Sequence, residues 1–385
     1  MIKLLEPIFK GKEQSFVRKC IKSGWITTGS FVEKFENKVK KYIGAKHAIA
    51  CINGTSALHI ALKLSKVKSN DEVIVPTLTF IAPVNAIIYN NAVPIFMDAD
   101  QYYNIDQEKT INFINNETFI KNKNCYNKKT KRKISALIIV HVFGNAAKFD
   151  KLYKLCKKKN IEIIEDATES LGTYYKSGLF KKKHCGTISK IACLSFNGNK
   201  IISSGGGGMI ITNNSTIEKH ARYLINQAKD HSKKFIHNNI GYNYKMSNLH
   251  AAIGLAQLSK INIILKRKKR INNLYEKKFE KIKGIHFVKS PMYSFNNNWL
   301  NIIQIDKKKY KINKNKLILN LQKKGIETRP VWRLNHLQKP FVKFQKYKIQ
   351  TAKKLVDISI CIPSSDNLKE SQLSKIVNLL KKEIL

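Results

Sequence analysis

The first two thirds of the chain alternate short apolar runs with segments of helical period. Between the apolar runs lie helix-period segments such as Ser56–Leu64 and Lys148–Lys158. Apolar strands separated by helices are typical of a sheet covered on both faces, so the pattern predicts a large, mostly parallel sheet of βα units. The predicted strands are Ala48–Ile52, Glu72–Pro76, Val93–Met97, Ala136–His141, Glu162–Asp166, Ile191–Phe196 and Met209–Thr212.

The last third has a different pattern. A long helix from about Ala252 precedes shorter strands at His286–Val288 and Leu300–Gln304, and a terminal helix is predicted at Gln372–Ile384. We therefore expect a large domain over residues 1–251 and a smaller α+β domain over residues 252–385. The Asn- and Lys-rich stretch Asn115–Lys133 predicts an exposed loop.

Composition adds an unusual charge to an ordinary globular chain. Hydrophobic residues make up 43% of the 385 residues, while 71 Lys plus Arg against 26 Asp plus Glu give a net charge of +45. The basic residues are spread along the chain without helix-turn-helix or zinc-finger spacing, so we expect no nucleic-acid partner. The densest runs, Lys128–Lys133 and Lys266–Arg270, predict a loop and a solvated helix face.

The seven cysteines are scattered and form no Cys-x-x-Cys pair, which predicts reduced, mostly buried thiols and no metal site. The N-terminus lacks the apolar segment of a signal peptide, and no run has the apolar length of a membrane span. These features predict a soluble, cytoplasmic protein without a membrane partner.

Three segments carry candidate chemistry, and the first runs from strand to turn to helix at Ala48–Ala57. Gly54 permits a tight turn, and Thr55 and Ser56 place hydroxyls and amides at the start of the predicted helix. A helix N-terminus binds anions through its free amides and its dipole. The alternative is an ordinary N-cap, in which Ser and Thr are also common.

The second segment, Ile161–Glu169, places two or three carboxylates at the end of an apolar strand. Ligands of open parallel sheets bind beyond the carboxyl ends of the strands. A carboxylate there could keep a pyridine nitrogen protonated and so make the ring an electron sink. The alternative is that Asp166 caps a following helix.

The third segment ends in Lys200, just past the strand Ile191–Phe196 and before the glycine run Gly205–Gly208. A lysine in a segment loosened by glycines can approach an aldehyde, and burial would help it act as a nucleophile and then a base. Four glycines between two β runs also suggest a close approach of the backbone.

Together these segments match one family in order and spacing. The chain resembles the nucleotide-sugar aminotransferases of the DegT/DnrJ/StrS type, which have the aspartate-aminotransferase-like pyridoxal-phosphate (PLP) fold type I. The matching segments are Ser23–Gly29, Asn53–Ala57, Pro76–Phe80, Glu165–Gly172, Ser195–Lys200, Gly241–Met246, Ala251–Leu258 and Cys361–Ser365.

The resemblance implies cofactor roles for residues that match the family position by position. Lys200 resembles the lysine that bonds covalently to pyridoxal 5'-phosphate, and Asp166 resembles the partner of the pyridine nitrogen. Glu169 stands where the family usually has Gln near the ring hydroxyl. Phe80 matches an aromatic residue that stacks on the ring.

The cofactor phosphate is expected to lie against Gly54, Thr55, Ser56 and Ser195, which match the family's phosphate ligands. Asn243 matches an asparagine that reaches the phosphate from the partner subunit. The resemblance therefore also implies a homodimer with shared active sites.

The sugar-nucleotide side of the site is implied by further matches. The expected substrate residues are Thr28, Gly29, Lys245, Arg329, Trp332 and His336. Lys245 replaces an Arg that is common in the family, so one bidentate contact becomes a point charge. Glu169, Asn226–Asp230 and Thr328–Trp332 resemble the subgroup of the legionaminic acid and bacillosamine pathways.

We expect an aminotransferase that moves an amino group from L-glutamate to a UDP- or GDP-linked 4-keto-6-deoxy sugar carrying a 2-acetamido group. Three alternative functions fit the sequence less well. A sugar dehydratase of this fold carries His in place of Lys200, so the lysine argues against it. A regulatory or nucleic-acid-binding relative is suggested by the charge alone, and an aminotransferase of amino acids alone is disfavoured by the sugar-type segments.

Overall fold

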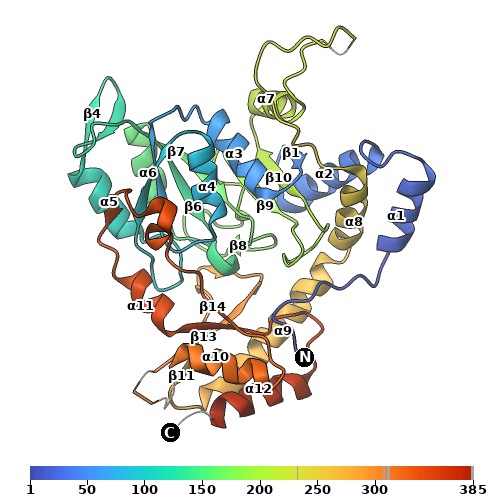
Figure 1. The fold of residues 1–385 in the computed structure, drawn as a ribbon, viewed down its shortest axis with the longest axis vertical. Helices are drawn as coiled ribbons and strands as arrows, with labels where there is room; N and C mark the ends of the chain where they lie inside the picture. Colours follow the sequence, from blue (N-terminus) through green and yellow to red (C-terminus); the bar gives the residue numbers. More distant parts are fainter. Residues whose placement is uncertain (232, 307, 310–312, 383–385) are drawn as a thin grey trace.

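An eight-stranded sheet forms the centre of the large N-terminal part of the chain (Figure 1). The computed structural model describes residues 1–231, 233–306, 308–309 and 313–382. From edge to edge, the strands are β1 (His47–Cys51), β10 (Gly208–Thr212), β9 (Ile191–Ser195), β7 (Glu162–Asp166), β6 (Ile134–Val140), β2 (Glu72–Pro76), β3 (Val93–Met97) and β15 (Lys346–Tyr347).

The seven predicted strands of this sheet are confirmed, each within two residues of its predicted bounds. Neighbouring strands from β9 to β15 run parallel, whereas β10 is antiparallel to both β9 and β1. Every residue of β6 is buried, as expected for a strand with protein on both faces.

Helices connect these strands and cover the sheet (Figure 1). Asn53, Asp106 and Asn214 each begin a helix by accepting a hydrogen bond from the backbone three residues on. The helices are α1 (Glu13–Lys22), α2 (Ser30–Ile43), α3 (Gly54–Leu64), α4 (Ala82–Tyr89), α5 (Gln107–Asn116), α6 (Asp150–Lys159) and α7 (Ser215–Ile225).

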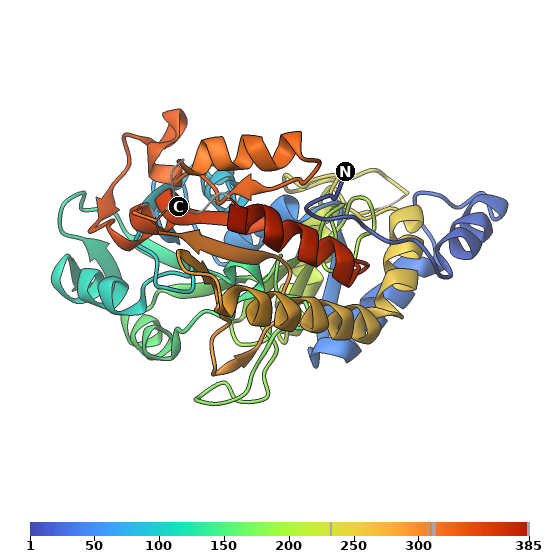
Figure 2. The same ribbon diagram turned by 90° about the horizontal axis from the view of Figure 1, so that it is seen from below.

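The C-terminal part has a small antiparallel sheet with α9 and α12 side by side against it (Figure 2). The strands are β11 (Ile285–Phe287), β13 (Asn301–Ile305), β16 (Ser359–Ile362) and β14 (Arg329–Pro330). The helices are α8 (Asn248–Leu258), α9 (Ile261–Glu280), α10 (Lys314–Lys323), α11 (Thr351–Ile358) and α12 (Glu370–Lys382).

Both predicted small-domain strands are confirmed as β11 and β13, but the single long helix from Ala252 is wrong. Two helices, α8 and α9, are separated at Ser259–Lys260, where Lys260 leaves helical geometry and pairs with Glu13. The predicted terminal helix is confirmed as α12 up to Lys382, and its last predicted residues, 383–384, lie outside the described residues.

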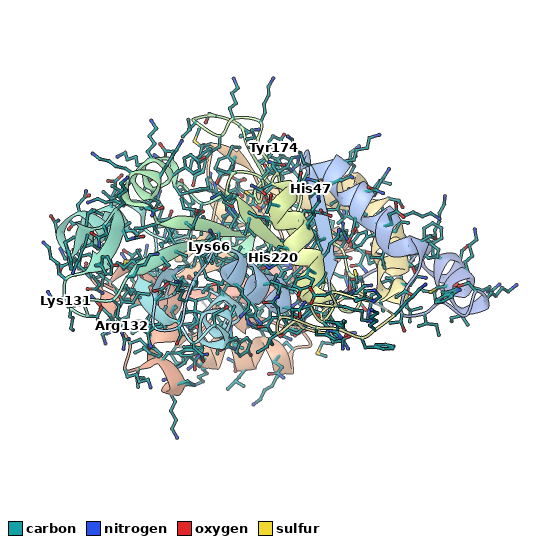
Figure 3. The ribbon with its side chains drawn as sticks, turned by 90° about the horizontal axis from the view of Figure 1, so that it is seen from above. His47, Lys66, Lys131, Arg132, Tyr174 and His220 are labelled. Atoms are coloured by element: carbon teal, nitrogen blue, oxygen red, sulfur yellow. The ribbon has the colours of Figure 1, made fainter. Side chains whose placement is uncertain are left out.

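The stretch Asn115–Lys133 is not a loop, because it contains the hairpin β4 (Thr118–Lys121) and β5 (Asn124–Asn127). Buried Asn127 donates to Glu72 at 2.8 Å and to Gln345 at 2.7 Å, which anchors the hairpin to the large sheet. The polar composition hid these anchors. Lys131 and Arg132 do lie exposed at the outer edge of the molecule (Figure 3).

The run Lys266–Arg270 is a solvated helix face except at Lys268, which is buried. Its ammonium donates to the carbonyls of Trp299 at 2.9 Å and Ser364 at 2.8 Å. Burial lowers the pKa of Lys268 to about 7. The prediction failed here because one turn of α9 faces the junction between the two sheets.

All seven cysteines are free and buried, which confirms the prediction of reduced internal thiols. Within the described residues, no group of three or more His, Cys, Asp or Glu side chains is arranged to hold a metal ion. No helix in the same part of the chain is long and apolar enough to cross a membrane.

Candidate active site

The end of β7 carries two buried carboxylates that point into different surroundings. Glu165 accepts the amides of Gly186 at 2.7 Å, Ile188 at 2.9 Å and Ser189 at 2.7 Å, and His141 Nε2 lies 3.1 Å away. Burial alone would raise the pKa of Glu165, but these hydrogen bonds and the His141 ring hold it below its usual range. Glu165 therefore joins strands and loops inside the large domain.

Asp166, the next residue, has far fewer partners. Its Oδ1 accepts the amide of Thr168 at 3.1 Å, and within the described residues no cation lies at ion-pair distance. Burial raises its pKa, and the hydrogen bonds from Thr168 offset only part of this. No helix begins at Asp166, so the capping alternative is not realised. A buried acid with this much unused acceptor capacity suits a ligand that brings a proton or a positive charge.

The start of α3 lies against the end of β9, beside Asp166. A Cβ atom on Gly54 would lie 3.0 Å from the Ser195 side chain and 3.2 Å from the Thr168 side chain, so any larger residue would have to push these side chains away. The N-cap is Asn53, which accepts the Ser56 amide at 2.8 Å. The hydroxyls of Thr55 and Ser56 are therefore not needed for capping and remain available to an anion at the helix N-terminus.

At one position, the glycine run Gly205–Gly208 allows two backbone segments to lie very close together, as expected. A Cβ atom on Gly208 would lie 2.3 Å from the carbonyl carbon of Asn53. The absence of a side chain at Gly208 therefore lets β10 pass directly beneath the turn that starts α3.

Lys200 lies in the turn after β9 and extends toward Glu169. Its Nζ atom is 3.3 Å from Glu169 Oε1 and 4.3 Å from the centre of the Trp299 ring. The Trp299 Nε1 donates to the carbonyl of Asn199 at 2.6 Å, which fixes the ring against the lysine turn. The amine is thus held by an acid on one side and an aromatic face on the other.

Glu169 is buried and connects Lys200 with the end of β6. Its Oε2 accepts the amide of Phe143 at 2.8 Å, and Phe143 adopts a left-handed conformation with φ of 57°. Burial raises the pKa of Glu169 to about 6, although Lys200 and the Phe143 amide lower it in part. A strained residue that aims an amide at a buried acid is typical of a functional site.

An aromatic group lines the space beside Lys200. Phe143 stacks on Trp332 at 4.6 Å between ring centres, and Trp332 lies 6.5 Å from Trp299. Phe80 meets Trp332 edge-on at 6.1 Å and is 53% exposed. Such an array can accept a flat ring or the apolar face of a sugar.

Trp299 and Phe143 were missed by the sequence reasoning. Phe143 follows β6, and residues that follow parallel strands gather at one edge of a sheet, so its position offered a signal. Trp299 offered none, because its contact with Asn199 and the pairing of β12 (Ser294–Phe295) with β8 (Tyr174–Tyr175) join segments that are far apart in the sequence.

The expected substrate residues fall into groups. Trp332 belongs to the aromatic group. His336 is buried, and its Nδ1 atom lies 2.7 Å from Thr77 Oγ1. Arg329, the first residue of β14, forms an ion pair with Glu327 at 2.7 Å. Thr28 and Gly29 lie exposed before α2, where Gly29 meets Asn248 of α8, away from β14 in Figure 1.

Asn243 and Lys245 form a third group between α7 and α8. Both side chains are exposed, and the backbone of Lys245 pairs with Cys51 at the end of β1. The part of the chain before them projects from the body of the molecule (Figure 1).

The two sheets, with a lysine and a buried acid at the carboxyl edge of the larger one, define the PLP-dependent aminotransferases of fold type I, as the resemblance predicted. Residues 7–381 match the DegT/DnrJ/EryC1/StrS aminotransferase family, and the chain belongs to this family. It is a PLP-dependent sugar aminotransferase.

Two curated relatives cover nearly the whole chain. EpsN of Bacillus subtilis, named as a pyridoxal phosphate-dependent aminotransferase, is 32% identical over 98% of this chain and 95% of its own length. GDP-perosamine synthase of Escherichia coli O157:H7 is 35% identical over 97% of this chain and 95% of its own length.

The fold is shared with solved structures. Helicobacter pylori PseC, described as an aminotransferase involved in the biosynthesis of pseudoaminic acid, matches with a TM-score of 0.86. At 21% identity, the match covers 99% of this chain and 98% of PseC. It shows the type I fold, which confirms the predicted fold class.

Proposed function

We propose that this protein transfers the amino group of L-glutamate to C4 of a 4-keto-6-deoxy sugar linked to GDP or UDP. The observation that carries the proposal is the position of Lys200, between Glu169 and the Trp299 ring and next to the strand end that bears Asp166. An amine in this setting can bond to an aldehyde and later carry a proton.

The residues around Lys200 suit pyridoxal phosphate. The α3 N-terminus, with Thr55 and Ser56, and the nearby Ser195 would hold the phosphate, and Phe80 would cover the ring. Buried Asp166, which lacks a cationic partner among the described residues, would keep the proton on the pyridine nitrogen. When bound, the cofactor supplies an aldehyde and an electron-withdrawing ring.

Side chains of this protein would carry out the proton transfers and stabilise the charges. With the cofactor bound, the Lys200 amine would take the proton from the Cα atom of glutamate and would later give one to C4 of the sugar. Asp166 would stabilise positive charge at the ring nitrogen in both directions of the reaction. The aromatic group excludes water from this side of the site.

The nucleotide-sugar class is supported by family membership and by the relative named GDP-perosamine synthase. That name favours a GDP-linked sugar. The resemblance of Glu169 and Thr328–Trp332 to the legionaminic acid and bacillosamine subgroup favours a 2-acetamido sugar.

A homodimer with shared sites is part of the proposal. Phe235 is 74% exposed and Ile240 is 82% exposed on the projecting segment between α7 and α8. Exposed apolar side chains of this kind often mark a protein–protein contact. Asn243 and Lys245 follow this segment and would serve the partner's site, together with Thr28 and Gly29.

The first test is Lys200→Ala. The variant should lose turnover and the visible absorbance of lysine-bound cofactor. Lys190→Ala is the matched control, because Lys190 lies at the other end of β9 in an exposed pair with Glu162 at 2.9 Å. Full activity of Lys200→Ala would refute the assignment.

The second test identifies the acceptor. Protein converted to its amine-loaded form with L-glutamate is mixed separately with GDP- and UDP-linked 4-keto-6-deoxy sugars, with and without a 2-acetamido group. The true acceptor should restore the original cofactor spectrum within one turnover. A 2-keto acid that does so while every sugar fails would mean that the protein acts on amino acids alone.

A further inference from the structure

Asn297 is a buried side chain that joins the two groups on either side of the Lys200 amine. Its Nδ2 atom donates to the carbonyl of Glu169 at 2.8 Å and to the carbonyl of Leu171 at 3.0 Å. Its Oδ1 atom accepts the backbone amide of Trp299 at 2.9 Å. One amide group therefore connects the acid that faces Lys200 with the ring that Lys200 contacts.

The partners of Asn297 require an amide at this position. The carbonyls of Glu169 and Leu171 can only accept hydrogen bonds, and the backbone amide of Trp299 can only donate one. A carboxylate could serve the Trp299 amide alone, and an apolar side chain could serve none of the three partners. The three hydrogen bonds together fix the rotation of the Asn297 amide and the separation of its neighbours.

The backbone around Asn297 is held as well. Its own amide donates to Thr173 Oγ1 at 3.1 Å, and Thr173 donates to the carbonyl of Gly144 at 2.8 Å. Gly144 has a φ of 83°, and a Cβ atom there would lie 2.0 Å from Asn297 Oδ1. A side chain at position 144 would therefore displace the Asn297 amide. The segments that follow β6 and β7 are both packed against this one residue.

Trp299 connects Asn297 with the turn that contains Lys200. Its backbone is held on both sides, because Asn297 accepts its amide and Lys268 donates to its carbonyl at 2.9 Å. Its indole Nε1 atom donates to the carbonyl of Asn199 at 2.6 Å, and its ring centre lies 4.3 Å from Lys200 Nζ. The position of the ring relative to Lys200 thus depends on where Asn297 holds the Trp299 backbone.

We propose that Asn297 is a positioning residue that sets the separation between Glu169 and the Trp299 ring and so fixes the place from which the Lys200 amine attacks an aldehyde. Asn297 lies outside the large sheet, in the segment that follows β12. A residue of the C-terminal part of the chain thereby aligns two groups of the N-terminal part. The inference rests on the proposed function, which gives Lys200 its reaction with pyridoxal phosphate.

The experiment compares two compounds that suit the same pocket, in cofactor-free protein. Pyridoxal phosphate bonds to Lys200 after the ammonium has lost one proton to solvent. The aldehyde carbon joins Nζ, and the aldehyde oxygen leaves as water with both hydrogens of the neutral amine. Pyridoxamine phosphate has no aldehyde and can only bind. Stopped-flow absorbance measures the rate of bonding, and an equilibrium titration measures the dissociation constant of pyridoxamine phosphate.

In Asn297→Leu, bonding of pyridoxal phosphate to Lys200 should be about 10- to 100-fold slower, because a displacement of about 1 Å can cost a factor of this order. The dissociation constant of pyridoxamine phosphate should stay close to the wild-type value. Asn297→Ala leaves space for water at the freed carbonyls and keeps the test valid if the leucine variant does not fold. It should show the same difference between the two compounds, with a smaller factor.

Asn127→Leu is the matched control, because Asn127 is a buried asparagine with the same pattern of hydrogen bonds. Its Nδ2 atom donates to Glu72 and Gln345, and its Oδ1 atom accepts the amide of Lys129, two residues on, at 2.9 Å. Glu72 begins β2, so these contacts lie at the opposite edge of the sheet from Lys200. The control should lose stability but bond pyridoxal phosphate at the wild-type rate.

A wild-type bonding rate in Asn297→Ala would overturn the proposal, and so would equal slowing in Asn127→Leu. Parallel losses of bonding and of pyridoxamine phosphate affinity would show that Asn297 only maintains the fold of the pocket. Failure of the proposed function would show differently. Borohydride reduction of the wild-type protein with pyridoxal phosphate would then label a residue other than Lys200, or none.

Discussion

Glu165 and Asp166 are consecutive, buried carboxylates on β7, yet their surroundings are opposite. Glu165 accepts three backbone amides, the Ser189 hydroxyl at 2.9 Å and a contact from His141, and its pKa is lowered despite burial. Among the described residues, Asp166 accepts hydrogen bonds from Thr168 only, and burial raises its pKa. The fold satisfies the oxygens of Glu165, whereas those of Asp166 keep acceptor capacity for the proposed cofactor contact.

On β7, we therefore expect Glu165 to contribute to stability and Asp166 to contribute to activity. Side chains of neighbouring strand residues point to opposite faces of a sheet, so two adjacent acids need not share any partner. A buried acid whose oxygens all accept hydrogen bonds stabilises the fold. A buried acid with few hydrogen bonds costs free energy of folding, and such acids are common at functional sites.

The largest effect is expected for Glu165→Ala. Removal of the carboxylate leaves His141 and the amides of Gly186, Ile188 and Ser189 without an acceptor, which should cost about 3–5 kcal/mol of stability. Denaturant unfolding followed by circular dichroism measures the loss. Glu162→Ala, which breaks only the exposed pair with Lys190, should cost less than about 1 kcal/mol.

Asp166→Asn should have the reverse profile. Turnover should fall about 100-fold or more, because an amide cannot stabilise the positive charge on the ring nitrogen. The free energy of unfolding of the cofactor-free protein should stay constant or rise, since a costly buried charge is removed. A marked loss of stability with normal turnover would show that Asp166 stabilises the fold and does not serve the reaction.

A smaller effect is expected for Thr168→Val. The side chain of Thr168 hydrogen-bonds to Asp166, so its loss should raise the pKa of Asp166 further and cost about 1 kcal/mol. A double-mutant cycle with Asp166→Asn tests the coupling, and the cost of Thr168→Val should shrink in that background. Equal costs in both backgrounds would show that Thr168 stabilises the loop independently of Asp166.

The smallest effect concerns pH. Since the folded-state pKa of Asp166 lies above its ordinary value of 3.8, its contribution to stability is full below that value and is lost as pH rises through the folded pKa. The stability advantage of cofactor-free Asp166→Asn over wild type should therefore grow as pH rises from about 4. Glu165 has the opposite sign, because its lowered pKa makes its contribution fail only as pH falls.

Much of the fold was predictable because it depends on local pattern. Apolar strands of the large sheet were placed within two residues, since a strand buried on both faces has an unmistakable run of apolar residues. The hairpin at 118–127 and the buried Lys268 were not predictable. Both consist of polar residues whose partners, Glu72 and the carbonyls of Trp299 and Ser364, are distant in sequence.

The candidate site divides in the same way. Asp166 and Lys200 follow strands, and strand ends of a parallel sheet meet at one edge, so their proximity followed from the sequence pattern. Trp299 is about one hundred positions beyond Lys200, and its contacts with Lys200 and Asn199 arise only when these distant segments pack together.

The sequence by itself determined the order of strands and helices and the residue types that pyridoxal phosphate chemistry needs, because period and strand-end position are local properties. The tertiary structure alone decided that Glu165 is saturated with hydrogen bonds whereas Asp166 is not, and that Lys200 lies between Glu169 and Trp299. Hydrogen-bond saturation and burial are set by residues far away in the chain. They exist only once the sheets have packed together.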